Sequence, residues 1–344
     1  MKDKKAVIEV QMNWIFVMII GGIILFFFIG VVVKQRSASE EKLVNELIRD
    51  VDQYMSGASV APRGAATLPV PGYDVYFSCD HLQIKNQRTL LESRVVFAPA
   101  FIDKDDRQLT VWALLWQMPF DVTNFLYVTG PGVRYVFVYE DSRYDDFYNN
   151  FVTDKINKIK PDIVGSERMI TFPDEGSYNT RIVMLGDIEP IQIPDFAKNS
   201  RTSFVWMPYF DPAEKIPYGD VYFLQWNPTS KEFEESQSVY IGVPSLVGAM
   251  FSESVEDYDC AMQKAFQNLY AVSSVFRKKI DLLGGSNVCP AFYGDYDKQL
   301  FDEIGSYSSQ PEKWQEDIPS LLSKIASIRQ RNFLIESQSC PLLY

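Results

Sequence analysis

A run of twenty residues without a charge or a proline, Trp14–Val33, constrains this chain more than any other feature. A helix rises about 1.5 Å per residue, so the run would span roughly 30 Å, the thickness of a bilayer's hydrocarbon core. Buried helices of soluble domains are seldom apolar on every face for so long. A cleaved secretory signal would be shorter and would end at small residues, which residues 31–35 (VVVKQ) do not provide. We therefore expect a retained transmembrane helix over residues 13–34.

The cysteines indicate which side of the membrane holds the bulk of the chain. Basic residues tie in number on the two sides of the span, so they do not decide its orientation. Cys79, Cys260, Cys289 and Cys340 all lie beyond it, and an even count suits disulfides in an oxidising compartment. Four buried thiols are the alternative. We expect a single-pass signal anchor in the plasma membrane, with residues 1–12 cytoplasmic and an extracellular domain at the cell surface.

The residues ahead of the span carry a family resemblance. Lys4-Lys5-Ala6 is followed by Val7-Ile8-Glu9 and then by the apolar run. This resembles the class III signal of archaeal and bacterial type IV pilins, which implies cleavage before the apolar helix and a pilin-like subunit. A cut after Ala6 would place Glu9 at the third mature position, whereas the family prefers the fifth. A plain signal anchor is the alternative.

The span leads into a segment with one apolar stripe. In residues 35–57, Val44, Leu47, Val51 and Met55 recur at steps of three and four, which is typical of an amphipathic helix. We expect a stalk helix over these residues. Its stripe would pack on the chain's own outer domain or on a neighbouring copy.

Residues 58–72 are rich in proline, glycine and alanine and predict a linker. Residues 73–254 alternate between short strand-like runs and turns, so we expect a strand-rich, mixed α/β ectodomain. A helix is expected over Ser142–Ile159, and a hairpin tip over residues 103–106. The expected strands are Asp74–Ser78, His81–Lys85, Arg94–Phe97, Leu109–Gln117, Phe125–Val128, Val133–Glu140, Arg168–Phe172, Arg181–Leu185, Phe204–Met207, Val221–Trp226 and Ser238–Val243.

Residues 255–344 predict a helical part packed on the ectodomain, with helices over Val255–Leu283, Lys298–Ile304 and Trp314–Ile335. The expected fold class is therefore α+β: a transmembrane helix, a stalk, a mixed sheet and C-terminal helices. The N-terminal anchor, a cysteine near the first strands and the ending Cys340-Pro-Leu-Leu-Tyr344 are similar to uncharacterised membrane-anchored proteins of small archaea. That likeness implies no activity.

Helix geometry suggests how the cysteines pair. If Val255–Leu283 is one helix, Cys260 lies 23 residues before its end, roughly 35 Å along the axis. The six residues from there to Cys289 reach back at most about 20 Å, too little for a bridge whose Cα atoms lie under roughly 7 Å apart. A second long helix returning antiparallel would bring Cys340 to Cys260. We expect Cys260–Cys340 and Cys79–Cys289.

The sequence offers few residues for chemistry. The only histidine, His81, stands two residues after Cys79, so a Cys-His pair on one face of a strand is conceivable. Asp103, Asp105 and Asp106 could hold calcium, but a solvated turn explains them equally. Zinc is not expected, because the cysteines are far apart. We expect no catalytic residue, cofactor or metal.

The net charge of −12 and pI near 4.7 argue against nucleic acid as a partner. We expect the lipid bilayer as a partner, with self-association or another surface protein as further candidates. The favoured function is structural or interactive: a scaffold, adhesin or pilin-like subunit, and not an enzyme. The alternative is a membrane-anchored ectoenzyme or solute-binding domain. A deep pocket that joins His81 or several carboxylates would favour that alternative.

Overall fold

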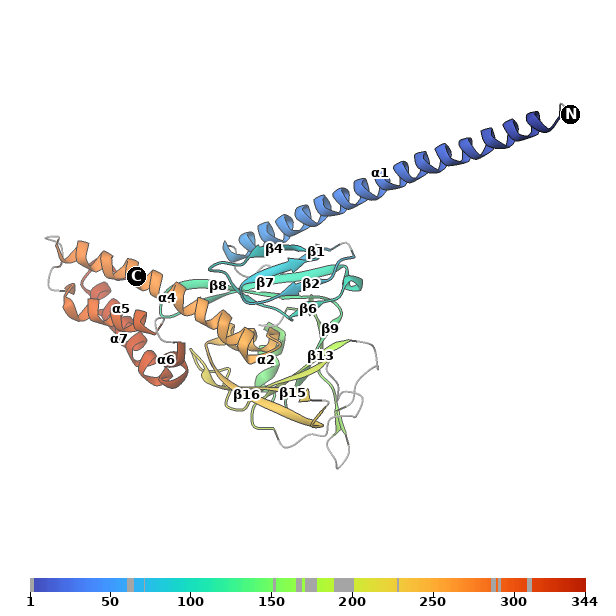
Figure 1. Cartoon of the computed structure of the whole chain (residues 1–344). Helices are drawn as coiled ribbons and strands as arrows, with labels where there is room; N and C mark the ends of the chain where they lie inside the picture. Colours follow the sequence, from blue (N-terminus) through green and yellow to red (C-terminus); the bar gives the residue numbers. More distant parts are fainter. Residues whose placement is uncertain are drawn as a thin grey trace. The chain divides into compact units, whose positions relative to one another are not determined.

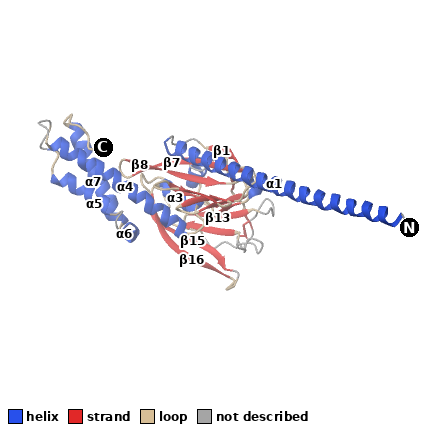
Figure 2. Cartoon of the chain, turned by 45° about the horizontal axis from the view of Figure 1, so that its top comes forward, coloured by secondary structure: helices blue, strands red, loops and turns tan. Residues whose placement is uncertain are grey.

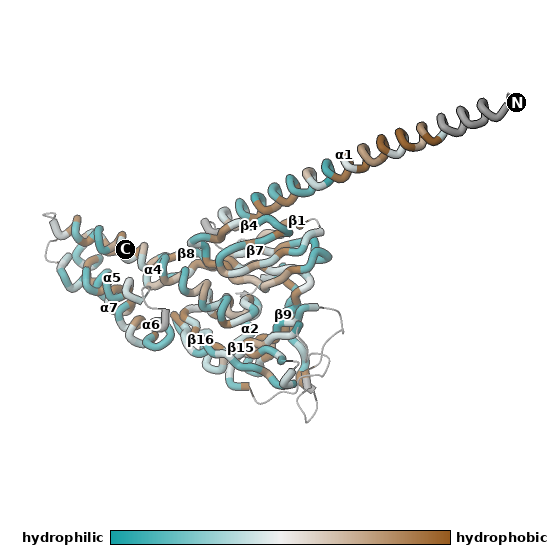
Figure 3. The backbone as a smooth tube through the Cα atoms, viewed as in Figure 1, coloured by the Kyte–Doolittle hydropathy of each residue, from teal (hydrophilic) through white to brown (hydrophobic). Residues whose placement is uncertain are grey.

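One continuous helix, α1, runs from Asp3 to Val60 and includes both the apolar run and the expected stalk. It is the one helix among the described residues that is long and apolar enough to cross a membrane. Figure 3 shows the apolar run as a largely hydrophobic section of α1. The pilin-like segment Lys4–Glu9 lies at the start of α1, where side chains fall outside the described part of the structure.

The computed structural model describes residues 3–60, 65–70, 72–150, 153–164, 169–170, 178–188, 201–227, 229–285, 289, 292–307 and 311–344. The chain divides into two compact units, Met1–Asp50 and Val51–Tyr344. The first unit is the N-terminal part of α1, which includes the apolar run. The second holds the last turns of α1 together with all the strands and the remaining helices (Figure 1).

The last turns of α1 are integrated into the second unit. Val51 and Met55 are fully buried there. Beside them along the helix, the Asp52 carboxylate pairs with the Arg94 guanidinium at 2.6 Å, and the Asp52 carbonyl accepts from the same group. The second half of the predicted stripe, Val51 and Met55, is therefore covered by the chain's own second unit. Val44 and Leu47 belong to the first unit, and their partners stay a prediction.

This burial makes the end of α1 sensitive to a single charge. Val51→Asp places a carboxylate where no water reaches, so we expect the free energy of unfolding to fall by about 3 kcal/mol or more. Tyr54→Asp, on the exposed side of the same helical turns, is the matched control and should cost far less. Denaturant unfolding of the full chain in detergent measures both, and equal effects would contradict the packing.

Two small sheets follow α1 in the chain. The first has the order β1-β7-β8-β5, and its neighbours are antiparallel except for β5 and β8, which are parallel. The second, β4-β3-β2-β6, is antiparallel throughout. The bounds are β1 Ala66–Pro69, β2 Val75–Phe77, β3 His81–Ile84, β4 Gln87–Leu90, β5 Val95–Phe97, β6 Phe101–Ile102, β7 Gln108–Gln117 and β8 Asp121–Thr129. Residues 58–72 are thus not wholly a linker, because β1 pairs with β7.

Six of the described strands form a larger mixed sheet in the order β10-β9-β13-β14-β15-β16. The first four are parallel, and β15 and β16 continue antiparallel as a long hairpin. β11 and β12 pair separately. The bounds are β9 Val133–Val138, β10 Asn157–Ile159, β11 Ile163–Val164, β12 Met169–Ile170, β13 Asn179–Leu185, β14 Thr202–Met207, β15 Tyr218–Asn227 and β16 Glu232–Ile241.

The predicted helix over Ser142–Ile159 is too long. Helix α2 covers only Arg143–Asn150, and β10 occupies the end of the predicted span. The apolar residues Ile156 and Ile159 satisfied a helical spacing, but β10 pairs in parallel with β9, and that tertiary pairing decides their structure. The α2 connection between two parallel strands is the β-α-β passage that the sequence predicts.

Helices fill the centre and one end of the second unit (Figure 2). Helix α3, Val243–Phe251, is buried from Ser245 onward and packs against β5, β7, β8 and β16. Periodicity does not predict α3 as a separate helix, because a short helix that is buried on all sides has no polar face. The further helices are α4 Val255–Gly284, α5 Asp295–Ser306, α6 Pro311–Glu316 and α7 Ile318–Ser337.

The expected helix Trp314–Ile335 is two helices. The Asp317 carboxylate accepts from the Ser320 backbone N–H and so starts α7 afresh, with Pro319 in its first turn. The overall class is α+β, as predicted, with a long apolar helix, mixed sheets and C-terminal helices. One apolar core joins the β1-β7-β8-β5 sheet and the six-stranded mixed sheet to α3 and α4. Its largest side chains include Phe97, Trp116, Phe137 and Tyr258.

All four cysteines form disulfides, but the pairing differs from the prediction. The bonds are Cys79–Cys260 and Cys289–Cys340, with Cα atoms 5.9 and 6.1 Å apart. The exclusion of Cys260–Cys289 holds, whereas the predicted Cys260–Cys340 and Cys79–Cys289 are wrong.

Ion pairs between the helices explain the error. Arg277 pairs with Asp302 and Lys298 with Asp281, so α5 runs antiparallel to α4. Lys324 pairs with Glu303 and Arg331 with Asp297, so α7 runs antiparallel to α5. Helix α7 is therefore parallel to α4 and ends beside the end of α4, where Cys289 lies. The predicted pairing assumed a single antiparallel return and did not include the additional reversal of chain direction at α5.

Non-reducing peptide mapping of the full chain should recover one peptide pair joining Cys79 to Cys260 and another joining Cys289 to Cys340. The parallel course of α4 and α7 keeps Cys260 and Cys340 near opposite ends of a 30-residue helix. A Cys260–Cys340 peptide would therefore contradict the order of the C-terminal helices. Four free thiols would contradict the oxidised state altogether.

Candidate functional site

The described part of the second unit contains a cleft of about 840 Å³. It lies where β9, β13 and β14 begin, and Figure 1 shows β9 and β13 side by side there. These strands start level with one another, since Asn179 is paired with Val133 and Thr180 with Thr202. Its volume lies within the range of pockets that hold small molecules.

One wall of the cleft consists of three aspartates from the connection between β6 and β7: Asp103, Asp105 and Asp106, which together form the acidic wall. Asp103 accepts the Asp105 backbone N–H at 2.8 Å and thereby starts a short 3-10 helix, Lys104–Asp106. Both Asp103 and Asp105 are exposed and Asp106 is half-buried. The sequence predicts a hairpin tip here, but β6 pairs with β2 whereas β7 pairs with β1 and β8, so the segment connects two sheets and is not a hairpin. It lines the cleft.

The turn between β8 and β9 holds the acidic wall in place. The Asp106 carboxylate accepts the backbone N–H of Gly132. A Cβ atom at either Gly130 or Gly132 would collide with that carboxylate, so both positions need glycine for this close approach. Burial raises the pKa of Asp106, the Gly132 bond opposes the rise, and the charges of Asp103 and Asp105 add to it.

Arg181, a buried residue of β13, also lines the cleft. Its guanidinium donates to the carbonyls of Ala249, Met250 and Glu253, at 3.1 to 3.4 Å, around the C-terminal end of α3. Burial lowers the pKa of Arg181 to about 10, and the Glu253 charge opposes that shift. The residue stays charged at neutral pH, and its charge is directed at the negative end of a helix.

Glu253 completes this corner of the cleft. Its carboxylate accepts the Ala100 backbone N–H at 3.0 Å, which connects the segment after α3 to the segment between β5 and β6. Its carbonyl also accepts from the Gln225 side chain at 2.9 Å. Neither Arg181 nor Glu253 was singled out in the sequence, because no local pattern marks a charge that caps a distant helix.

Aromatic rings make up much of the remaining surface. Phe101, Tyr135, Tyr178 and Phe251 all line the cleft. The Tyr135 hydroxyl donates to Thr129 Oγ1 at 3.0 Å, and its ring packs on Phe251 with centroids 4.5 Å apart. The Arg134 guanidinium lies 3.7 Å from the centroid of the Tyr178 ring, a cation–π contact.

The opposite end of the same sheet is closed by an aromatic side chain. Ligands of open parallel sheets usually bind at the carboxyl ends of strands, where neighbouring strands connect to opposite sides, as β9 and β13 do here. Tyr144 of α2 occupies this position, and its hydroxyl donates to the Phe210 carbonyl at 2.9 Å. Gly186 has φ +85°, and an added Cβ would lie 2.6 Å from the Tyr144 hydroxyl. The open cleft is therefore at the amino ends.

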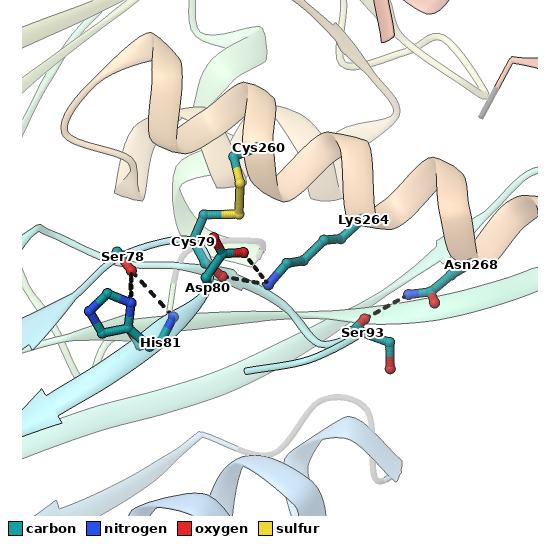
Figure 4. Close-up of polar contacts among 8 residues, drawn as sticks. All are labelled: Ser78, Cys79, Asp80, His81, Ser93, Cys260, Lys264 and Asn268. Atoms are coloured by element: carbon teal, nitrogen blue, oxygen red, sulfur yellow. Dashed lines mark hydrogen bonds and ion pairs between the residues drawn. A yellow bond between two sulfur atoms is a disulfide. The ribbon is translucent and has the colours of Figure 1, made fainter. Parts of the chain in front are cut away.

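The conceivable Cys79–His81 pair is not a catalytic pair. Cys79 lies in the turn between β2 and β3, not in a strand, and its sulfur is bonded to Cys260. His81 Nδ1 lies 2.8 Å from Ser78 Oγ in the same turn (Figure 4). Neither Cys79 nor His81 lines the cleft.

Figure 4 shows what the turn does instead. Three residues of α4 at four-residue steps contact the connections between strands. Cys260 forms the disulfide with Cys79, Lys264 donates to the Cys79 carbonyl at 2.5 Å, and Asn268 donates to the Ser93 carbonyl at 2.9 Å. Burial lowers the pKa of Lys264, and the nearby Asp80 carboxylate opposes that shift. These contacts hold α4 against the β2–β3 and β4–β5 connections, which is a structural role.

The three aspartates of the acidic wall do not converge as calcium ligands would. Among the described residues, the only three Cys, His, Asp or Glu side chains with ligand atoms all within 4.8 Å of one another are Cys79, Asp80 and Cys260, where the two sulfurs form the disulfide. Ca²⁺ needs six to eight oxygens at about 2.3–2.6 Å, so the acidic wall is not a built calcium site.

Comparisons with family models, with curated proteins and with solved structures find no match for this chain. The assignment of function therefore depends on the cleft and on the sequence.

The raised pKa of Asp106 makes stability depend on pH in a defined direction. The native state binds this proton more tightly than the unfolded chain, so the carboxyl's contribution is complete below its unfolded pKa of 3.8 and is lost as pH rises through the native pKa. Asp106→Asn keeps an oxygen for the Gly132 N–H and has no proton to lose. Between about pH 4 and pH 7, the variant should lose less stability than the wild type.

Denaturant midpoints across this pH range measure the effect. Asp121→Asn changes a carboxyl that is exposed and lies outside the cleft, and it is the control. A wild-type pH profile in the Asp106→Asn variant would show that the carboxyl is not held in the arrangement described.

Proposed function

We propose that this chain is a single-pass membrane protein whose extracytoplasmic domain binds a small polar solute in the cleft at the amino ends of β9, β13 and β14. The observation that carries the proposal is a cleft of about 840 Å³ lined by four carboxylates of the described residues, Asp103, Asp105, Asp106 and Glu253. The sequence favours a structural or interaction role, with a deep pocket that joins several carboxylates as the feature expected to favour an ectoenzyme or a solute-binding domain instead.

The anchor and the disulfides support the proposed location. One N-terminal helix is long and apolar enough to span a membrane, and both disulfides lie beyond it. Structural disulfides persist in oxidising compartments. We infer a plasma-membrane protein with its N-terminus inside and its cleft outside, with the bilayer as partner.

Binding, and not catalysis, is the activity proposed for the cleft. The only histidine of the chain, His81, is the first residue of β3 and does not line the cleft. Arg181 is directed at three backbone carbonyls. The carboxylates of Asp103, Asp106 and Glu253 each accept one backbone N–H, which positions them, and a carboxylate has further lone pairs with which to meet a solute.

Filling the cleft should abolish binding. Ser203 of β14 lines the cleft, and Ser203→Trp places a ring in it. Ser236→Trp puts the same ring on the exposed part of β16, outside the cleft, and is the matched control. The full chain in nanodiscs would be tested by saturation-transfer NMR against free amino acids, short peptides, amines and neutral sugars.

We expect at least one of these probes to bind the wild type and the Ser236→Trp variant but not the Ser203→Trp variant. Binding that is equal in all three proteins would place the solute elsewhere. No binding by any probe would remove the support for a solute-binding domain.

A further inference from the structure

The side chains that line the cleft are unevenly charged. Four carboxylates stand against two guanidinium groups, Arg181 and Arg201, among the described lining residues. Arg181 is buried and its guanidinium faces the backbone carbonyls at the end of α3. The charge that a ligand meets at this side of the cleft is therefore predominantly negative.

The acidic wall repels itself. Asp103, Asp105 and Asp106 lie within four residues of one another on one short connection, and the first two charges both raise the pKa of the third. The Lys104 side chain between them is exposed, and its backbone N–H donates to Asp74. A positive group placed in the cleft would lower the electrostatic energy of this wall.

The size and the surface of the cleft favour an organic cation over a bare metal ion. A single ion fills a small fraction of 840 Å³, and the carboxylates do not converge on one point. Phe101 and Tyr178 are partly exposed and offer apolar area and aromatic faces, which attract ammonium and guanidinium groups, whereas Tyr135 and Phe251 are buried. Arg134 already occupies one face of Tyr178 in this way.

We propose that the cleft selects organic cations: molecules with an ammonium or guanidinium group directed at Asp103, Asp105 and Asp106 and an apolar body against the aromatic rings. This inference rests on the proposed function, since it names the ligand class of the same cleft. It leaves the identity of the physiological amine to the binding experiment.

Three probes of one shape test the charge preference. Phenethylammonium, 2-phenylethanol and phenylacetate carry the same ring with a positive, neutral or negative end. Each is titrated calorimetrically into the full chain in nanodiscs of phosphatidylcholine, whose zwitterionic surface has no net charge to attract the cation. We expect phenethylammonium to bind most tightly of the three.

The acidic wall is then neutralised without a change of shape. In Asp103→Asn/Asp105→Asn, the affinity for phenethylammonium should fall about fivefold or more, because two partly screened attractions are lost. Glu232→Gln/Glu235→Gln removes the same net charge from the exposed part of β16 and should change the affinity less than about twofold.

Several results would overturn the inference. Tighter binding of phenylacetate, equal binding of all three probes, or an equal loss in both double variants would each show that the acidic wall does not select the ligand. Displacement of phenethylammonium by millimolar Ca²⁺ that itself binds more tightly would show a metal site. If neutral or anionic solutes bind in the Ser203→Trp comparison, the ligand class is wrong while the proposed function stands. If no solute binds at all, both fail.

Discussion

The contact on which the second unit most depends is between Arg181 and the end of α3. A helix leaves its last carbonyls without intrahelical partners, and α3 ends in the interior, where water cannot replace them. One guanidinium from the centre of the mixed sheet donates to two of these groups, the carbonyls of Ala249 and Met250, and also to the Glu253 carbonyl just beyond the helix. The mixed sheet, helix α3 and the segment that carries Glu253 are thus held together. The cleft lies at this junction and is lined by residues of all three.

The acidic wall depends on a second close approach, between Asp106 and the Gly130-Pro131-Gly132 turn. Side chains at either glycine would push the β6–β7 connection away from the strand starts. The opposite end of the sheet shows the reverse use of glycine, because Gly186 admits the Tyr144 ring and closes the position where such sheets usually bind ligands. Small residues open one end of this sheet and allow an aromatic residue to fill the other.

Much of the fold could be predicted from local pattern. The apolar run, the strands and the long helix α4 follow from periodicity that the structure keeps. The errors arise where a distant partner decides: β10 is a strand because β9 is its neighbour, and Cys340 pairs with Cys289 because α5 reverses the chain once more. The candidate site shows the same limit. Residues 103–106 are predicted as a turn, and Gly130-Pro131-Gly132 has the composition of one. Nothing in either segment indicates that it contacts the other, and no local pattern distinguishes Arg181 from other arginines in strands.

The Cys79–Cys260 disulfide has a consequence for proteolysis of this chain. The 181-residue separation between these cysteines encloses the whole mixed sheet and every described residue that lines the cleft. A single cut of the backbone inside that loop leaves the two pieces covalently joined through sulfur. The cleft would therefore stay attached to the long apolar helix α1 after such a cut, and its release would require a second cut or reduction of the bond.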